Sequence, residues 1–135
     1  MSKSSMRGGS WKQFLADQDN VTFSQASPVQ NTWYTVFEKN NCAIRASEFA
    51  VADTGEDIEV KMTIDGTART GSATFGAAAI YNLVPQEGGN PKLDNAPYPD
   101  YRGGFQWQGR SIKIEMRKTS AAGTGTFSAT VKWGK

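Results

Sequence analysis

Histidine is absent from this 135-residue chain, and cysteine occurs once, as Cys42. The lack of histidine removes the usual serine and cysteine triads, most zinc sites and the commonest general base near neutral pH. A single cysteine cannot form a disulfide within the chain. No stretch reaches the roughly 18 apolar residues of a membrane-spanning helix, and residues 1–11 lack the apolar run of a secretory signal. We therefore expect a soluble protein made in the cytoplasm, with no membrane partner.

Neither sign of charge is in large excess, because 15 Lys and Arg oppose 13 Asp and Glu for a formal net charge of +2. This balance is not typical of a disordered chain or of a polybasic nucleic-acid module, so nucleic acid is not expected as a partner. The length favours one folded domain.

What the chain does contain is strict alternation of apolar and polar residues in three segments. Ile58 to Asp65, Ser111 to Arg117 and Thr126 to Trp133 each place apolar side chains on one face and polar ones on the other, as half-buried strands do. The residues predicted to lie in the core are Ile58, Val60, Met62, Ile64, Ile112, Ile114, Met116, Phe127, Ala129, Val131 and Trp133. The pattern predicts an antiparallel sheet with one wet face.

Turn signals divide the rest of the chain. Asn40-Asn41 is typical of a turn, and Asp65-Gly66 predicts a tight hairpin. The apolar phase slips near Ser47 and Glu48, which indicates a bulge. From Val84 to Gly104 a long segment rich in Pro and Gly is predicted to be a loop, and long loops in compact domains are usually functional or interfacial.

These signals together predict an all-β protein: an antiparallel, jelly-roll-like β-sandwich of about eight strands over residues 31–135. Residues 1–30 are predicted to be an extended N-terminal arm. Met1 to Ser10 has the Ser- and Gly-rich composition of a flexible segment. In Trp11 to Asp19, Trp11, Phe14 and Leu15 fall at helical spacing, which suggests a short helix or turn that would need docking to persist.

Candidate chemistry is sparse. The densest acidic group is Glu56, Asp57, Glu59 and Asp65, but we assign these residues to turns and to a solvated strand face rather than to a paired-carboxylate active site. Asp94 and Asp100 match no calcium-loop spacing, and Cys42 is expected to be an inert core thiol. We predict no catalytic residue, metal site or cofactor, and no enzyme activity.

Basic residues cluster at Arg110, Lys113, Arg117 and Lys118. Since Lys113 and Arg117 would share an outward face with Glu115 between them, most of this charge is interpreted as a partly self-paired surface. The alternative is a basic platform with Trp107 for an acidic neighbour or nucleic acid.

Aromatic residues in and after the long loop allow two interpretations. Tyr98, Tyr101, Phe105 and Trp107 either fold over an open end of the sandwich or form an anchor cluster for a protein or glycan partner. Our candidate interface residues are Trp11, Phe14, Tyr98, Tyr101, Phe105, Trp107 and Arg110.

Three segments also carry a resemblance to a known group of proteins. Asn31 to Val36, Asp57 to Gly66 and Arg110 to Arg117, with the short final strand, resemble small structural proteins of tailed-bacteriophage particles. That resemblance implies a virion protein present in many copies, such as a capsid decoration or cement protein, a fibre base, or a connector, head or tail subunit. It further implies a homo-oligomer, with a trimer expected, that contacts other virion structural proteins. The hypothesis from another class is a carbohydrate- or receptor-binding module that uses the aromatic loop of residues 84–107.

Overall fold

The computed structural model describes residues 19–53, 55–76, 79–85, 90–95, 107–120 and 125–134. These residues form eight strands: β1 Asp19–Gln25, β2 Tyr34–Val51, β3 Glu56–Ile64, β4 Thr67–Phe75, β5 Tyr81–Val84, β6 Lys92–Asp94, β7 Trp107–Lys118 and β8 Phe127–Gly134. Every pairing between them is antiparallel. The predicted all-β, jelly-roll-like sandwich of about eight strands is confirmed. In this part of the chain no helix is long and apolar enough to cross a membrane.

The strands follow one hydrogen-bonded path, β1-β8-β2-β7-β3-β4, with β5 pairing β2 and β6 pairing β5. Residues Tyr34 to Ile44 of β2 pair with β7, and residues Ala43 to Val51 pair with β8. One layer therefore contains the start of β2 with β7, β3 and β4. The other contains the end of β2 with β8, β1, β5 and β6.

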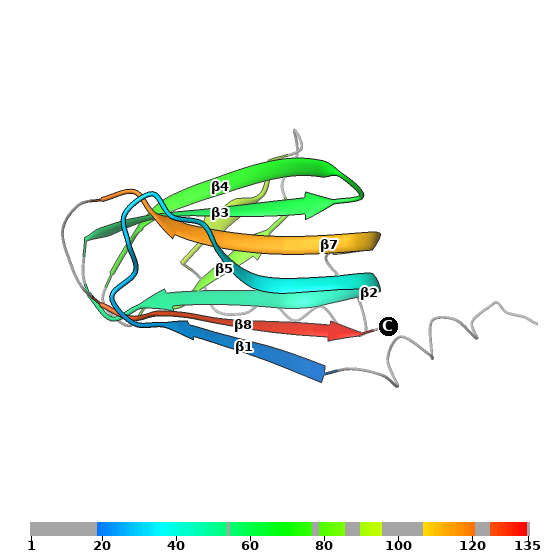
Figure 1. The fold of residues 1–135 in the computed structure, drawn as a ribbon, viewed down its shortest axis with the longest axis horizontal. Coiled ribbons are helices and arrows are strands. Elements are labelled where there is room, and N and C mark those ends of the chain that lie inside the picture. The colour runs from blue at the N-terminus through cyan, green and yellow to red at the C-terminus, as the bar shows by residue number, and fades with distance from the viewer. Residues whose placement is uncertain are drawn as a thin grey trace, which may run out of the picture.

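Strand β2 joins the two layers because it reverses direction near Asn41. A straight strand of this length would separate its ends by about 55 Å. Yet the Tyr34 ring lies 6.1 Å from the ring of Phe127, whose strand partner is Val51. Asn41 has a φ of 51°, as a turn residue tolerates. Figure 1 shows the two legs of β2 meeting in a bend at the end of the molecule where the β3–β4 hairpin closes and β7 begins.

The core lies between the layers and contains most residues that the alternation predicts. Ile64 and Trp133, at strand ends, are only partly buried and pack against it. The largest fully buried side chains include Phe37, Phe49, Phe75, Phe127, Ile44 and Leu83.

Several local predictions need correction. Asp19–Gln25, within the predicted arm of residues 1–30, is strand β1 of the sheet, paired along its whole length with β8. Its alternation gives a weak signal because only Val21 and Phe23 are apolar. The bulge lies between Ile44 and Ala46, earlier than Ser47, and a second one lies between Thr35 and Phe37.

The predicted loop from Val84 to Gly104 contains the short strand β6. The helix or turn suggested at residues 11–19 lies outside the described residues, apart from Asp19, which begins β1.

Candidate interaction surface at the β2 bend

Two of the seven candidate interface residues lie within the described residues, and both are near the start of β7. Trp107 is partly buried and Arg110 is exposed. They lie at the end of the sandwich where β2 bends and the β3–β4 hairpin closes (Figure 1). The other five candidates, Trp11, Phe14, Tyr98, Tyr101 and Phe105, lie outside the described residues, so their role stays a prediction.

A cavity of about 250 Å³ opens at this end of the molecule. Its walls are mainly apolar because Met62 and Ile64 belong to the inner face of β3, and Trp107 lines it as well. The indole Nε1 of Trp107 is buried, and no hydrogen-bond partner for it occurs in the described part of the chain. The full set of lining residues is Met62, Ile64, Thr67, Arg69, Pro91 and Trp107. The cavity can therefore accept an apolar group.

A second, wider hollow of about 420 Å³ lies beside Arg110 and is lined by Asn41, Cys42, Asp65, Gln108, Gly109 and Arg110. The carboxylate of Asp65 accepts the backbone N–H groups of Arg110 and Ser111 at 2.8 and 3.0 Å. A Cβ on Gly109 would lie 2.8 Å from Cγ2 of Ile64, so this glycine lets the Asp65 turn approach β7. Asp65 thus anchors the hairpin predicted at Asp65-Gly66, whose two residues have φ values of 50° and 87°.

Cys42 is buried beneath this hollow, as predicted for an inert thiol. Its Sγ donates to the backbone carbonyl of Lys39 at 3.7 Å. Burial raises the pKa of the Cys42 thiol, and the nearby Lys39 charge opposes this only in part. A thiol that stays protonated is a poor nucleophile.

Each of the four clustered acidic residues is engaged in structural contacts. Oε1 of Glu59 lies 2.6 Å from Nη2 and 2.7 Å from Nε of Arg117. Asp57 accepts the Thr74 hydroxyl at 2.6 Å. Among the described residues, no group of three or more acidic or cysteine side chains is arranged to hold a metal ion; Asp94 lies on β6, and Asp100 is outside these residues.

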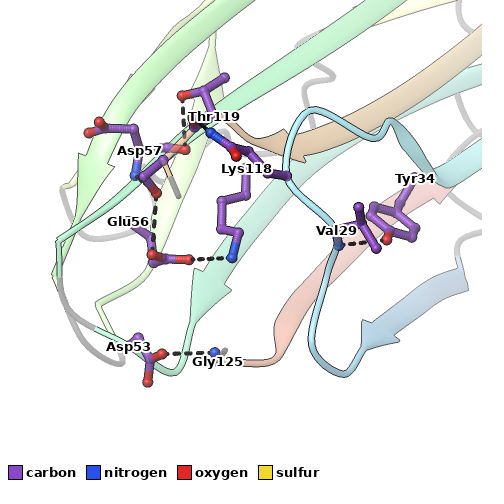
Figure 2. Close-up of polar contacts among 10 residues, drawn as sticks. Val29, Tyr34, Asp53, Glu56, Asp57, Lys118, Thr119 and Gly125 are labelled. Atoms are coloured by element: carbon purple, nitrogen blue, oxygen red, sulfur yellow. Dashed lines mark hydrogen bonds and ion pairs between the residues drawn. The ribbon is translucent and has the colours of Figure 1, made fainter. Parts of the chain in front are cut away.

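The prediction that Glu56 lies at a solvated turn is wrong, because this residue is only 1% exposed. Its Oε2 lies 3.6 Å from Nζ of Lys118, and its Oε1 accepts the Ser120 hydroxyl at 3.2 Å. Figure 2 shows the two charged side chains pointing toward one another, from β3 and from the end of β7. Ile58 and Met116 face the core, and residues two apart in a strand share a face. The alternation therefore predicts that Glu56, two residues before Ile58, and Lys118, two residues after Met116, also face inward.

The basic cluster is accordingly divided between two faces. Lys118 points inward, so it does not belong to the surface. On the outer face Lys113 and Lys61 both pair with Glu115, at 3.9 and 3.5 Å, as expected for a self-paired surface. Trp33 is not among the predicted interface residues, yet its ring lies 4.4 Å from Nζ of Lys61 and 4.5 Å from Cζ of Arg117. This stack covers part of the face with an aromatic ring that contacts two cations.

A comparison with protein-family models gives no match, and a comparison with curated proteins gives none either. Among solved structures, the chain is similar to the "Structure of infectious bursal disease virus Gx strain", with a TM-score of 0.43 and 19% identity over 87% of this chain and 30% of that one. It is also similar to the infectious bursal disease virus VP2 subviral particle, with a TM-score of 0.41 and 18% identity over 85% of this chain and 30% of that one. The chain thus spans under a third of the length of these proteins, and likenesses of this degree carry no conclusion about function.

Proposed function

We propose that this chain is a structural protein of a virus particle, and specifically of a tailed bacteriophage, that works by making contacts with copies of itself and with other virion proteins. The observation that carries the proposal is the open edge of the sheet at β1, which pairs with β8 on one side and with no other described strand. Exposed strand edges are sites of pairing with another chain.

The charged side chains support the same function. Glu56, Glu59 and Asp65 are used to hold strands and turns together, as the contacts above show. Carboxylates engaged in this way stabilise the scaffold rather than activate a substrate. The sequence resemblance to tailed-phage structural proteins adds to this support and suggests a capsid decoration or cement protein, or a head or tail subunit.

The finer assignments belong to the same proposal. We propose a homo-oligomer, with a trimer as the expected cyclic form, and residues 1–18 as a docking arm onto a neighbouring subunit. The protein would be made in the host cytoplasm and reside in the virion. An electron-microscopy map of the intact particle tests this directly, because density matching the sandwich is expected at repeated positions, and its absence from the particle would refute the proposal.

Deleting Met1 to Ser10 tests the arm. The truncated chain should keep the far-UV circular dichroism and melting temperature of the full chain but bind the particle less strongly. Loss of the folded core on deletion would show that these residues support the sandwich instead.

A second candidate is a carbohydrate- or receptor-binding module using the segment of residues 84–107, and the cavity beside Trp107 favours it. The Trp107 side chain lines this cavity, and aromatic side chains are common in the walls of ligand pockets. A glycan array should then show binding that Trp107→Ala and Tyr101→Ala abolish. The matched control is Trp133→Ala, because Trp133 is also a partly buried tryptophan but does not line this cavity. No binding across the array would count against this candidate.

A further inference from the structure

Strand β1 is an edge strand of unusual regularity. All seven residues from Asp19 to Gln25 pair with β8 in unbroken register, from Asp19 opposite Trp133 to Gln25 opposite Phe127. The other edge of β1 faces no strand among the described residues. No described strand pairs with its backbone N–H and C=O groups on that side.

This edge lacks the devices that prevent strand pairing. Proteins protect exposed edges with lysine, proline, bulges or inward-pointing charges. Between Asp19 and Gln25 there is no lysine, proline or glycine, and the one charge, Asp19, is at the first position. The register with β8 shows no bulge.

Strand β4, at the other end of the path, differs from β1 because it carries a charged residue away from its ends and because another segment approaches it. β4 carries Arg69 on its exposed half, and the segment before β6 approaches it closely. A Cβ on Gly71 of β4 would lie only 2.7 Å from the backbone oxygen of Pro91. Of these two edges, β1 is the one that the described residues leave uncovered.

The sequence of β1 is also complementary to itself. If two copies pair antiparallel about Thr22, Asn20 lies opposite Ser24, Val21 opposite Phe23 and Thr22 opposite its own copy. Aromatic with β-branched, and threonine with threonine, are favourable cross-strand pairs. Asp19 then faces Gln25, so no like charges meet, whereas a parallel pair would place Asp19 beside Asp19.

Burial favours the same arrangement. Val21 and Phe23 are only partly buried on the inner face, where they pack against the core. A second copy of β1 would cover their exposed sides. Asn20, Thr22 and Ser24 are exposed on the outer face, where they would form a polar row across the junction.

We propose that β1 is a self-pairing edge, through which two copies of this chain join about a two-fold axis at Thr22 and form one continuous sheet from β8 to the partner copy's β8. The inference deepens the proposed function, on which it rests for the presence of many copies. The two-fold contact is separate from the proposed cyclic contact and would link subunits in pairs.

Charge complementation tests the contact. Sedimentation equilibrium of the wild-type chain should show reversible self-association that includes the joining of chains in pairs. Thr22→Lys and Thr22→Glu, made separately, each place like charges opposite one another and should raise the dissociation constant about fivefold or more. An equimolar mixture of the two variants should recover or exceed wild-type association.

The matched control is Ser128→Lys, which adds the same charge on the same outer face but one strand away from the junction. It should leave the dissociation constant within about twofold of wild type. Circular dichroism checks that each variant melts like the wild type, as expected for exposed positions. A wild-type chain that is monomeric up to about 1 mM, the range of weak contacts, would overturn the inference, as would Thr22 variants that dimerise normally or a mixture that fails to recover.

Cross-linking tests the register. In a Cys42→Ala background, the double variant Asn20→Cys with Ser24→Cys should form a covalent dimer with a short bismaleimide, because position 20 of one copy lies opposite position 24 of the other. Each single variant should not, because its two thiols would be about 13 Å apart along the strands. Failure of the double variant, or equal linking by a single variant, would refute pairing about Thr22.

These outcomes separate the inference from the proposed function. A chain that dimerises through β1 but is absent from the particle keeps the inference and loses the virion role. If the chain is found in the particle with β1 away from any second copy, the virion role is kept and the inference is lost.

Discussion

The ion pair between Glu56 and Lys118 offers a sharp test of how the two ends of β3 and β7 are held together. The side chains are 2% and 5% exposed, and Nζ lies 3.6 Å from Oε2. Removing one member of such a pair leaves the other charge buried without its counter-ion, which typically costs about 3–5 kcal/mol. That is a large part of a total stability of about 5–15 kcal/mol.

Glu56→Leu and Lys118→Met should each lower the free energy of unfolding by this amount. For a chain of this size the melting temperature should fall by about 10–20 °C. The double variant should recover most of the loss, because a buried ion pair replaced by apolar groups of similar volume is often neutral or stabilising. Urea denaturation followed by tryptophan fluorescence measures the free energy of unfolding of all four proteins in this double-mutant cycle: the wild type, the two single variants and the double variant.

The control is Glu48→Gln, which removes a pair of similar type on a more exposed part of the sheet. Nζ of Lys132 lies 4.0 Å from Oε2 of Glu48, with side chains 34% and 23% exposed, and the expected loss is below about 1 kcal/mol. The reasoning would be refuted if Glu56→Leu cost no more than this control. A coupling energy below about 0.5 kcal/mol between Glu56 and Lys118 would refute it too.

Two substitutions and one reactivity measurement test the packing of the sandwich. Gly71→Ala should destabilise the fold by about 1–3 kcal/mol in urea denaturation, because its Cβ would meet the backbone oxygen of Pro91 at 2.7 Å, whereas Gly76→Ala, with its nearest contact at 3.8 Å, should be near neutral; equal effects would contradict the close approach. The Cys42 thiol, whose pKa burial raises, should react at pH 8 at least ~10-fold more slowly with a disulfide reagent in the folded chain than in urea. Because its folded pKa is above the unfolded value, the stability linked to this thiol is full below the unfolded pKa and declines as pH rises toward the folded one; a folded thiol as reactive as the unfolded one would contradict this. Trp33→Leu should cost about 1–2 kcal/mol through loss of both cation contacts, and a change within error of zero in urea denaturation would show that the stack contributes nothing.

Much of the fold could be predicted because its signals are local. The alternation in residues 58–65, 111–117 and 126–133 placed three strands and their inner faces correctly, since successive side chains of a strand point to opposite faces whatever lies beyond. The turn at Asn40-Asn41 and the hairpin at Asp65-Gly66 were likewise visible, because few residues tolerate positive φ. β1 was missed, because two apolar residues are too few to stand out from an extended arm.

The candidate surface was less predictable from sequence. Trp107 and Arg110 were chosen as exposed contact residues, but the cavity beside Trp107 depends on Met62 and Pro91, which come from distant parts of the chain. Trp33 gave no signal of its own, because the two cations that contact its ring belong to β3 and β7.

The sequence by itself determined that this chain is a sheet protein, which side chains of its clearest strands enter the core, and that histidine chemistry is excluded. Only the tertiary structure decided that β2 folds back to join two layers, that Glu56 and Lys118 meet in the interior, and that β1 is left at an open edge. The reason is physical: side-chain alternation is a property of a single strand, whereas layer, partner and edge depend on free energies shared between segments far apart in the chain.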